Sequence, residues 1–364
     1  MIRLHKLIDL FRFDNFSKSC QISIHISTFQ KFKTFGKLGI KILIINFLIL
    51  LISCKNDKKA ISRYYELTPT ITILGKEKPQ NADEKAENIE GVIAPENMIY
   101  VKGGNTYIGN DSSGIVTENP RIWVHINPFF MDISPVTVAQ FRAFVTATNY
   151  KTEAEKFGNG AFIDASSDNK WILKEGANWQ YPQGKDYPKA KDNHPVTQVS
   201  WNDAQAYAQW ASKRLPHEWE WEHAARNAQN DQTLYSFGDN LKDEKGKWRT
   251  NIWQGTFPIK NRVEDGFKFT SPVGIFGKTP LGLTDMTGNV WQWCDNGRFE
   301  YAEVLDALEK DGKISINNTE KAQKSGSFLC EDTWCHGYRV SGRSFTSPET
   351  SLMHVGFRCV KDLK

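Results

Sequence analysis

One uninterrupted stretch, from Met98 to Lys364, most constrains the fold, because it contains no second low-complexity segment and no obvious short repeat. A stretch of this size exceeds the commonest domain length but can still fold as one unit. The chain carries 26 Gly and 12 Trp, which favours many turns and aromatic packing over long helices. We therefore expect one irregular, loop-rich α+β domain over residues 96–364.

Several short elements can be predicted within this domain. Thr137–Thr148 carries apolar side chains at helical spacing, and Ser200–Lys213 begins with a serine that can cap a helix. The residues expected on the buried face of the second helix are Ala204, Tyr207, Trp210 and Ala211. Pro216 suits the first turn of a third helix. Glu218, Glu220 and Glu222 follow it, and negative side chains are stabilising at the positive N-terminal end of a helix. Ile99–Ile108 alternates around a Gly-Gly pair, which predicts a hairpin.

The first 54 residues have the composition of a leader. Residues 42–52 form an apolar run of 11 residues, preceded by Lys37 and Lys41. A secretory signal has a basic region and an apolar core of about 7–15 residues, whereas a transmembrane helix needs about 20. The ending Leu51–Cys54 resembles a bacterial lipobox, which implies cleavage before Cys54 and lipidation of that cysteine. A short membrane anchor that is not cleaved is the alternative.

The charge distribution follows the same division. The net charge of +4 comes from the leader, which has eight Lys or Arg against two Asp or Glu and leaves 38 basic and 40 acidic residues. The remainder therefore has no net positive charge to favour nucleic acid. Residues 55–95 are polar and charged, which predicts a disordered tether spanning roughly 35 Å. We expect an exported lipoprotein, facing the periplasm or the cell surface and held at a membrane.

Two cysteines near the C-terminus, Cys330 and Cys335, lie five residues apart, with Ser327 shortly before them. Two thiols at this spacing could form a disulfide, bind a soft metal or carry out thiol redox chemistry. His336 follows the second cysteine, but a tetrahedral zinc site normally has a second spaced pair of ligands. The residues alone leave these alternatives open.

Nine short motifs, taken together, resemble the formylglycine-generating enzyme (sulfatase-modifying factor) family. In chain order they are TEAEKFG at 152–158, GANW at 176–179, HPV at 194–196, VSWNDA at 199–204, KRLP at 213–216, NIWQG at 251–255, EDGF at 264–267, GNVW at 288–291 and GFRC at 356–359. Each motif is weak alone, but the set follows the family order over nearly all of the domain. The resemblance implies a monomeric, loop-rich fold related to C-type lectins.

The same resemblance implies an oxidoreductase that uses copper and O₂. Members of this family oxidise a cysteine in a Cys-x-Pro-x-Arg segment of an unfolded sulfatase to Cα-formylglycine, with a thiol as reductant. Cys330 and Cys335 are the implied Cu(I) ligands, with Cys335 the one that exchanges with the substrate sulfur. Two thiolates suit soft Cu(I) and leave a position open. Ser327 and Trp291 match positions that line the oxygen pocket; core packing is the alternative for both.

Calcium is the second metal that the resemblance implies. One site would use the side chains of Asn251 and Asp265 with the carbonyl oxygens of Ile252 and Phe267. The other would use Asp285, the carbonyl oxygens of Gly288 and Val290, and the side chain of Gln292. Clustered oxygens of this kind suit a hard cation. The second site departs from the family, which usually has glutamate at 292 and asparagine at 285. Turn capping is the alternative for these acidic residues.

The other cysteines of the domain also depart from the family. Members often have two structural disulfides, but Ala208, Ala225 and Val340 stand at three of those four positions. Cys359 has therefore lost its usual partner, and Cys294 is additional. The two could pair with each other or remain buried thiols.

Two further residues lie near the substrate groove by resemblance. Glu331 stands where a basic residue or histidine is common, which could alter peptide preference. His354 is expected there without a catalytic role.

Two other functions compete with the oxidase. One is a non-catalytic structural or binding lipoprotein with the same fold, which would have no need of the cysteine pair. The other is an iron-dependent sulfoxide synthase, whose chemistry needs a histidine-rich site. His217 and His223 are six residues apart and form no His-x-x-x-His pair, so the sequence does not support the iron site.

Overall fold

The computed structural model describes residues 65–68, 70–80, 82, 91–310, 312–331 and 335–363. The chain divides into two compact units, Met1–Ala60 and Ile61–Lys364, and every described residue lies in the second. The predicted leader, including Cys54, lies outside the described residues. Among the helices of the described part, none has the length and apolar character required to cross a bilayer.

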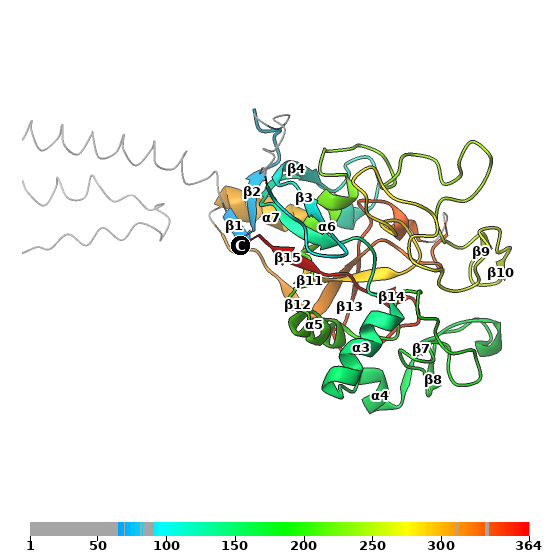
Figure 1. The fold of residues 1–364 in the computed structure, drawn as a ribbon. Coiled ribbons are helices and arrows are strands. Elements are labelled where there is room, and N and C mark those ends of the chain that lie inside the picture. The colour runs from blue at the N-terminus through cyan, green and yellow to red at the C-terminus, as the bar shows by residue number, and fades with distance from the viewer. Residues whose placement is uncertain are drawn as a thin grey trace, which may run out of the picture. The chain divides into compact units, whose positions relative to one another are not determined.

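The first described strands belong to a four-stranded antiparallel sheet (Figure 1). Its order is β1 (Tyr65–Thr68), β2 (Ile71–Gly75), β5 (Ile122–Ile126) and β4 (Gly104–Ile108). On β2, Ile71 and Ile73 are 1% and 0% exposed and pack in the core with side chains of β5. The predicted tether over 55–95 is therefore wrong at 65–68 and 71–75. The alternating isoleucines build a buried strand although the residues around them are strongly polar.

A second sheet joins the C-terminal strand to the start of the domain. Its order is β15 (Val360–Asp362), β6 (Phe129–Asp132) and β3 (Met98–Val101). The predicted hairpin over Ile99–Ile108 is wrong, because β3 pairs with β6 while β4 pairs with β5 in the other sheet. Between β3 and β4, a Cβ on Gly103 would lie 2.5 Å from the carbonyl oxygen of Ile126. The Gly-Gly pair thus carries the chain from one sheet to the other at a point without space for a side chain.

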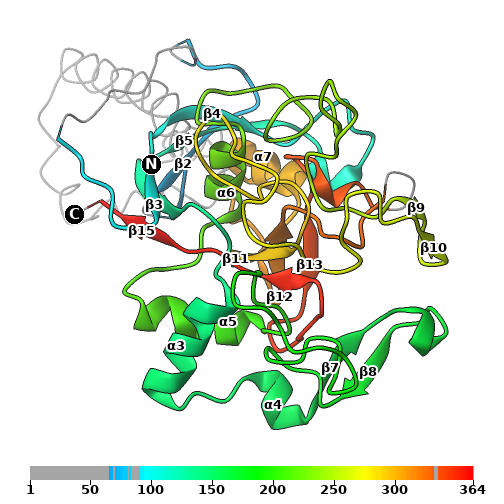
Figure 2. The same cartoon turned by 45° about the vertical axis from the view of Figure 1, so that its right-hand side comes forward.

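A third sheet contains β12, the strand that precedes the predicted cysteine pair in the chain (Figure 2). Its order is β13 (Ser344–Thr346), β12 (Asn317–Lys324), β11 (Trp291–Arg298) and β14 (Val355–Gly356). β14 runs parallel to β11, and the other pairs are antiparallel. The helix α7 (Tyr301–Lys310) connects β11 to β12 and buries three side chains, Tyr301, Val304 and Ala307.

The two predicted helices are confirmed. α3 (Val138–Thr148) and α5 (Trp201–Trp210) each begin after a residue that forms a reciprocal capping box, Thr137 and Ser200 respectively. On α5, Ala204 and Tyr207 are buried as expected. Trp210 is 44% exposed, so its place on the buried face is wrong.

The helix α6 (Glu218–Ala225) is buried throughout, although it carries three glutamates. It begins after His217, so Pro216 precedes the helix cap and is not in the first turn. The ion pairs are Glu218 with Arg343 at 2.6 Å, Glu220 with Arg214 at 2.7 Å and Glu222 with Lys324 at 2.9 Å. A buried carboxylate that loses its partner is strongly destabilising. The Glu222–Lys324 pair therefore fixes the end of β12, directly before the cysteine segment.

Shorter elements complete the domain. They are α4 (Glu153–Phe157), the ribbon of β7 (Asn159–Phe162) with β8 (Ile172–Glu175), the ribbon of β9 (Gly255–Thr256) with β10 (Lys260–Asn261), and the 3₁₀ turns Val116–Glu118, Ala165–Ser167 and His336–Tyr338.

Candidate functional site

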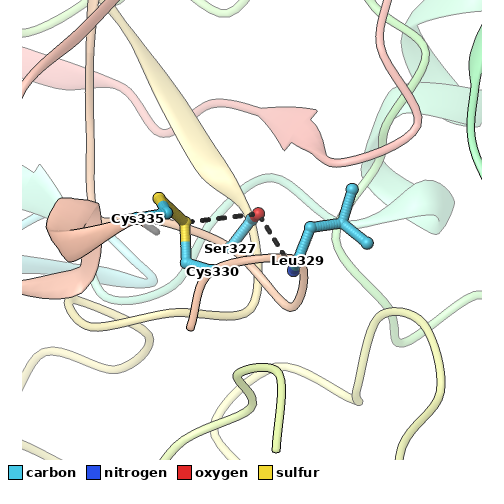
Figure 3. The surroundings of a disulfide bond; sticks show 4 residues. All are labelled: Ser327, Leu329, Cys330 and Cys335. Atoms are coloured by element: carbon cyan, nitrogen blue, oxygen red, sulfur yellow. Dashed lines mark hydrogen bonds between the residues drawn. A yellow bond between two sulfur atoms is a disulfide. The ribbon is translucent and has the colours of Figure 1, made fainter. Parts of the chain in front are cut away.

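The turn after β12 brings the predicted cysteine pair together. Ser325 and Gly326 have φ angles of +90° and +66°, so the chain turns sharply after the last residue of the strand. The sulfur atoms of Cys330 and Cys335 are joined as a disulfide, and their Cα atoms lie 4.9 Å apart (Figure 3). The disulfide alternative is thus the state of the pair in this structure.

Ser327 lies beside the first of these sulfurs (Figure 3). Its hydroxyl oxygen is 4.0 Å from Cys330 Sγ and accepts a hydrogen bond of 3.2 Å from the main chain of Leu329. The main chain of Cys330 in turn donates to the carbonyl oxygen of Ser327 at 2.9 Å. Ser327 is fully buried, so this tight turn holds one hydroxyl against the sulfur and away from solvent.

The two cysteines differ in accessibility. Cys330 is 2% exposed, and its carbonyl oxygen accepts a hydrogen bond from the main chain of Trp253. Cys335 is partly exposed at the edge of the same hydrophobic cluster. An incoming polypeptide would therefore reach Cys335 before Cys330.

Trp291, the fourth predicted catalytic residue, lies in that cluster with Cys330 and Tyr338. It begins β11 and is 6% exposed, and its main-chain N–H donates to the carbonyl oxygen of His354 at 2.9 Å. Ser327, Cys330 and Cys335 thus lie together, and Trp291 belongs to the same hydrophobic cluster as the two cysteines.

The residues of the first predicted calcium site also come together. Asp265 accepts hydrogen bonds from the main chains of Ile252 and Phe267 at 3.1 and 2.9 Å. The side-chain nitrogen of Asn251 donates to the carbonyl of Phe269, which leaves its buried Oδ1 without a hydrogen-bond partner among the described residues.

Burial raises the pKa of Asp265, which a bound cation would counteract. An unpaired buried amide oxygen and a carboxylate whose charge is poorly solvated are ligand types that suit a hard cation. The residues present fit calcium at this site provided that the amide nitrogen of Gln254, which donates to both the Ile252 carbonyl oxygen and Asp265, moves away.

The second predicted calcium site does not fit a cation. The Gln292 Oε1 atom accepts hydrogen bonds from Trp221 Nε1 at 2.9 Å and from Arg358 Nε at 2.7 Å. Both partners can only donate, so the orientation of this amide is fixed. Its Nε2 group then points at the carbonyl oxygen of Asp285, to which it donates at 2.7 Å. A proton donor thus occupies the position where calcium would need an oxygen.

Two more of the predicted ligands of that site are also engaged. The Asp285 carboxylate accepts from the main chain of Gly274 and from Asn289, and the Gly288 carbonyl oxygen accepts from Ser325. The buried guanidinium of Arg358 adds a positive charge at the same place.

The other two cysteines are unpaired. Cys294 and Cys359 are both fully buried, and neither is bonded to another described cysteine. Burial raises the pKa of both thiols well above the ordinary value, so neither is a reactive thiolate at neutral pH. Ala208, Ala225 and Val340, at the positions of lost disulfide partners, are buried too.

Two further residues differ from the sequence analysis, which misplaced one and missed the other. Glu331 was expected to face the groove but is only 4% exposed. The ring of His354 lies 5.2 Å from that of Trp171, which is 46% exposed and which no motif had indicated. Burial lowers the pKa of His354 to about 3, so its imidazole is neutral at physiological pH.

A pocket of about 140 Å³ adjoins the cysteine segment. Its wall includes Leu329, directly before Cys330, and apolar side chains of Trp253 and Phe257. The one carboxylate in the wall belongs to Asp164. Burial alone would raise the pKa of Asp164, but hydrogen bonds from Ser166 and Tyr187 and the charge of Lys268 hold it below its ordinary value.

Comparison with known proteins shows what this chain resembles. The sequence model of the sulfatase-modifying factor enzyme 1-like domain matches residues 85–363. A formylglycine-generating enzyme of Thermomonospora curvata is 39% identical over 284 residues, which cover 73% of this chain and 93% of that protein. The formylglycine-generating enzyme of Mus musculus is 36% identical over 287 residues, covering 74% and 76%.

Not every relative is active. The inactive C-alpha-formylglycine-generating enzyme 2 of Bos taurus is 38% identical over 280 residues, covering 72% of this chain and 87% of that protein. Among solved structures, PvdO from Pseudomonas aeruginosa superposes with a TM-score of 0.55 at 21% identity, over 76% of this chain and 100% of that chain. This likeness agrees with the predicted mixed, loop-rich fold.

Proposed function

Because the chain belongs to the sulfatase-modifying factor enzyme 1-like family, we propose that it matures sulfatases by converting a cysteine of the sulfatase polypeptide to Cα-formylglycine. One observation carries the proposal: Cys330 and Cys335 lie within bonding distance beside a buried hydroxyl, with only the second accessible. The proposed client segment is Cys-x-Pro-x-Arg in a chain that has not yet folded.

The accessible sulfur defines how the chain's own residues would act. Once the disulfide is reduced, the Cys335 sulfur is the one that the client cysteine can approach, while Cys330 stays buried. The Ser327 hydroxyl can donate to the Cys330 sulfur and stabilise its thiolate, since it lies beside that atom. The Trp291 indole is 6% exposed and belongs to the hydrophobic cluster that includes Cys330, where it would help to exclude water.

The donor set suits Cu(I). Within the part of the chain that the structure describes, no three or more His, Cys, Asp or Glu side chains gather as a metal site. Two thiolates are enough for a soft monovalent ion and leave a position for the client sulfur. Copper bound there would supply electron transfer to O₂, which is the proposed oxidant, with a thiol as the reductant.

The pocket beside Leu329 supports a client of this sequence. Its apolar wall offers a surface for the prolyl ring, and the Asp164 carboxylate offers a charge partner for the arginine. The proposed client segment would then lie between the cysteine pair and the β9–β10 ribbon.

Calcium has one place in this proposal. The Asn251 and Asp265 site would hold a structural cation and stiffen the loop at 251–267. This loop supports the cysteine pair, because the main-chain N–H of Trp253 donates to the Cys330 carbonyl oxygen. At Gln292 we propose no calcium.

Export and anchoring are a further part of the proposal. The apolar run at 42–52 and the lipobox ending at Cys54 support a lipoprotein signal. A lipid on Cys54 would hold a monomeric enzyme at the periplasmic or outer face of a membrane, where newly exported sulfatases pass.

Conversion of a synthetic Cys-x-Pro-x-Arg peptide tests the activity. The copper-loaded wild-type chain, given O₂ and a thiol reductant, should convert the peptide, and mass spectrometry should show the loss of one sulfur and two hydrogens and the gain of one oxygen. Cys335→Ala should reduce conversion to background. Cys294→Ala is the matched control, because that thiol is buried away from the pair, and it should keep most of the activity. Full conversion by Cys335→Ala would exclude the assignment.

A non-catalytic binding lipoprotein is the second candidate, favoured by the similarity to the inactive bovine relative. This candidate predicts that the wild-type chain binds the client peptide without changing its mass. A retained peptide of unchanged mass, with copper present, would support binding over catalysis.

A further inference from the structure

The segment that carries Cys335 is closely packed at three glycines, two of them against backbone atoms and one against a side chain. A Cβ on Gly326 would lie 2.4 Å from the main-chain nitrogen of Tyr338, and one on Gly342 would lie 2.6 Å from the carbonyl oxygen of Gly337. A Cβ on Gly337 would lie 2.2 Å from two ring carbons of Trp291, Cη2 and Cζ2. Contacts this short do not occur in packed proteins, so each position excludes a side chain.

Gly337 differs from Gly326 in the reason for its glycine. Gly326 has a φ of +66°, which favours glycine for the backbone alone. Gly337 has no such angle, so any residue could adopt its backbone conformation. What excludes a side chain at 337 is the indole of Trp291.

Neither side of this contact can move easily. Trp291 is 6% exposed, and its backbone is held by pairing with Val355 and by the hydrogen bond to the His354 carbonyl. On the other side, Tyr338 is 2% exposed and stacks on Tyr235 with ring centroids 5.8 Å apart. A side chain at 337 would therefore displace the indole or shift the backbone that leads to Cys335.

We propose that Gly337 is a positioning residue, whose missing side chain lets the Trp291 indole lie directly against the backbone that carries Cys335. The inference rests on the proposed function and deepens it, because it explains how the accessible cysteine is held in place relative to Trp291 and Cys330. Gly337 acts through its neighbours and touches no substrate.

The first test measures peptide conversion by the full chain. Gly337→Ala should lower kcat by about 100-fold, because a displacement of about 1 Å at a reacting group can have that effect. Its KM should change much less, since the pocket near Leu329 is untouched. Gly312→Ala is the matched control: the nearest atom to a Cβ there is 3.7 Å away, and its kcat should stay at the wild-type value.

A double-mutant cycle separates positioning from general destabilisation. Phenylalanine at 291 lacks the two distal ring carbons that a Cβ at 337 would strike. Gly337→Ala should therefore reduce kcat by less than about threefold when placed on Trp291→Phe, in contrast to its effect on the wild-type chain. An equal loss in both backgrounds would overturn the proposal.

A second measurement does not depend on conversion. It is the equilibrium in which the Cys330–Cys335 disulfide reacts with two reduced glutathiones to give two protein thiols and one oxidised glutathione. Gly337→Ala should shift this equilibrium constant by about tenfold, and adding Trp291→Phe should restore it. Gly103→Ala, which creates a contact of 2.5 Å far from the pair in sequence, should lower the melting temperature without shifting the equilibrium.

The two measurements keep this inference separate from the activity. If the wild-type chain converts no peptide but the glutathione equilibrium shifts and recovers as expected, the proposed function fails and the positioning role stands. If conversion is normal in wild type and Gly337→Ala changes neither kcat nor the equilibrium, the positioning role fails and the proposed function stands.

Discussion

At the scale of single residues, hydrogen-bond partners distinguish two sites that the sequence could not tell apart. Asn251 and Gln292 are both fully buried amides that the resemblance placed beside calcium. The first has an oxygen without a partner, while the second has an oxygen fixed by two donors and a nitrogen turned toward Asp285. Only the structure reveals this difference, because it depends on Trp221 and Arg358, which are remote in sequence.

The chain should therefore bind one calcium ion. Native mass spectrometry of the full chain should find one Ca²⁺ per molecule, lost in Asp265→Asn and retained in Gln292→Ala. Bound calcium should also raise the melting temperature of the wild type, because a ligand specific to the folded state stabilises it. Two ions per wild-type chain, or loss of an ion in Gln292→Ala, would contradict this reading.

His354 should make the stability depend on pH. Its pKa is lowered by burial from an ordinary value of 6.5 to about 3, so the unfolded chain binds a proton between these values that the folded chain does not. Stability should then decrease as pH falls from neutrality through this range. Urea unfolding of His354→Asn at about pH 7 and pH 5 should show a smaller decrease than that of the wild type. His336 is exposed, so His336→Asn is the control and should show the same decrease in stability as the wild type. The same dependence of stability on pH in all three proteins would refute a contribution of His354.

At the scale of elements, the sequence predicted what is local and failed where distant strands pair. α3 and α5 were predictable because Thr137 and Ser200 cap them within one turn. The hairpin at 99–108 was wrong because alternation does not reveal which partner a strand chooses. The cysteine pair was predictable from its spacing, whereas the Gly337 and Trp291 contact joins two separate elements and left no local signal.

The strand β2 provides a test of this correction. Ile73→Ala removes a fully buried side chain and should lower the free energy of unfolding by about 2–5 kcal/mol. Thr72→Ala, on the neighbouring and less buried position, should cost much less. Denaturant unfolding measures both, and a negligible effect of Ile73→Ala would restore the tether at this position.

At the scale of the whole molecule, the charge distribution and the proposed lipid anchor both separate the first 54 residues from the remainder. The first 54 positions carry eight Lys or Arg against only two Asp or Glu, and the remainder is slightly acidic. This division suits the proposed catalytic body held in water beside a membrane, and it leaves that body without a net positive charge to favour nucleic acid.

Lipidation can be tested in a bacterial host. Metabolic labelling with a fatty-acid analogue should mark the wild-type chain, and the labelled protein should be found in the membrane fraction. Cys54→Ala should remove the label, while Cys20→Ala, within the same leader, should keep it. A labelled Cys54→Ala protein would place the modification elsewhere.

The strand β1 has a consequence for reach. The first described strand begins at Tyr65, so only ten residues separate it from Cys54. Fully extended, that spacing covers about 40 Å, less than the diameter of roughly 50 Å expected for a body of this size. With an acyl chain on Cys54, the enzyme could not diffuse through the compartment. It would stay close to the lipid headgroups and bind its clients at the membrane surface.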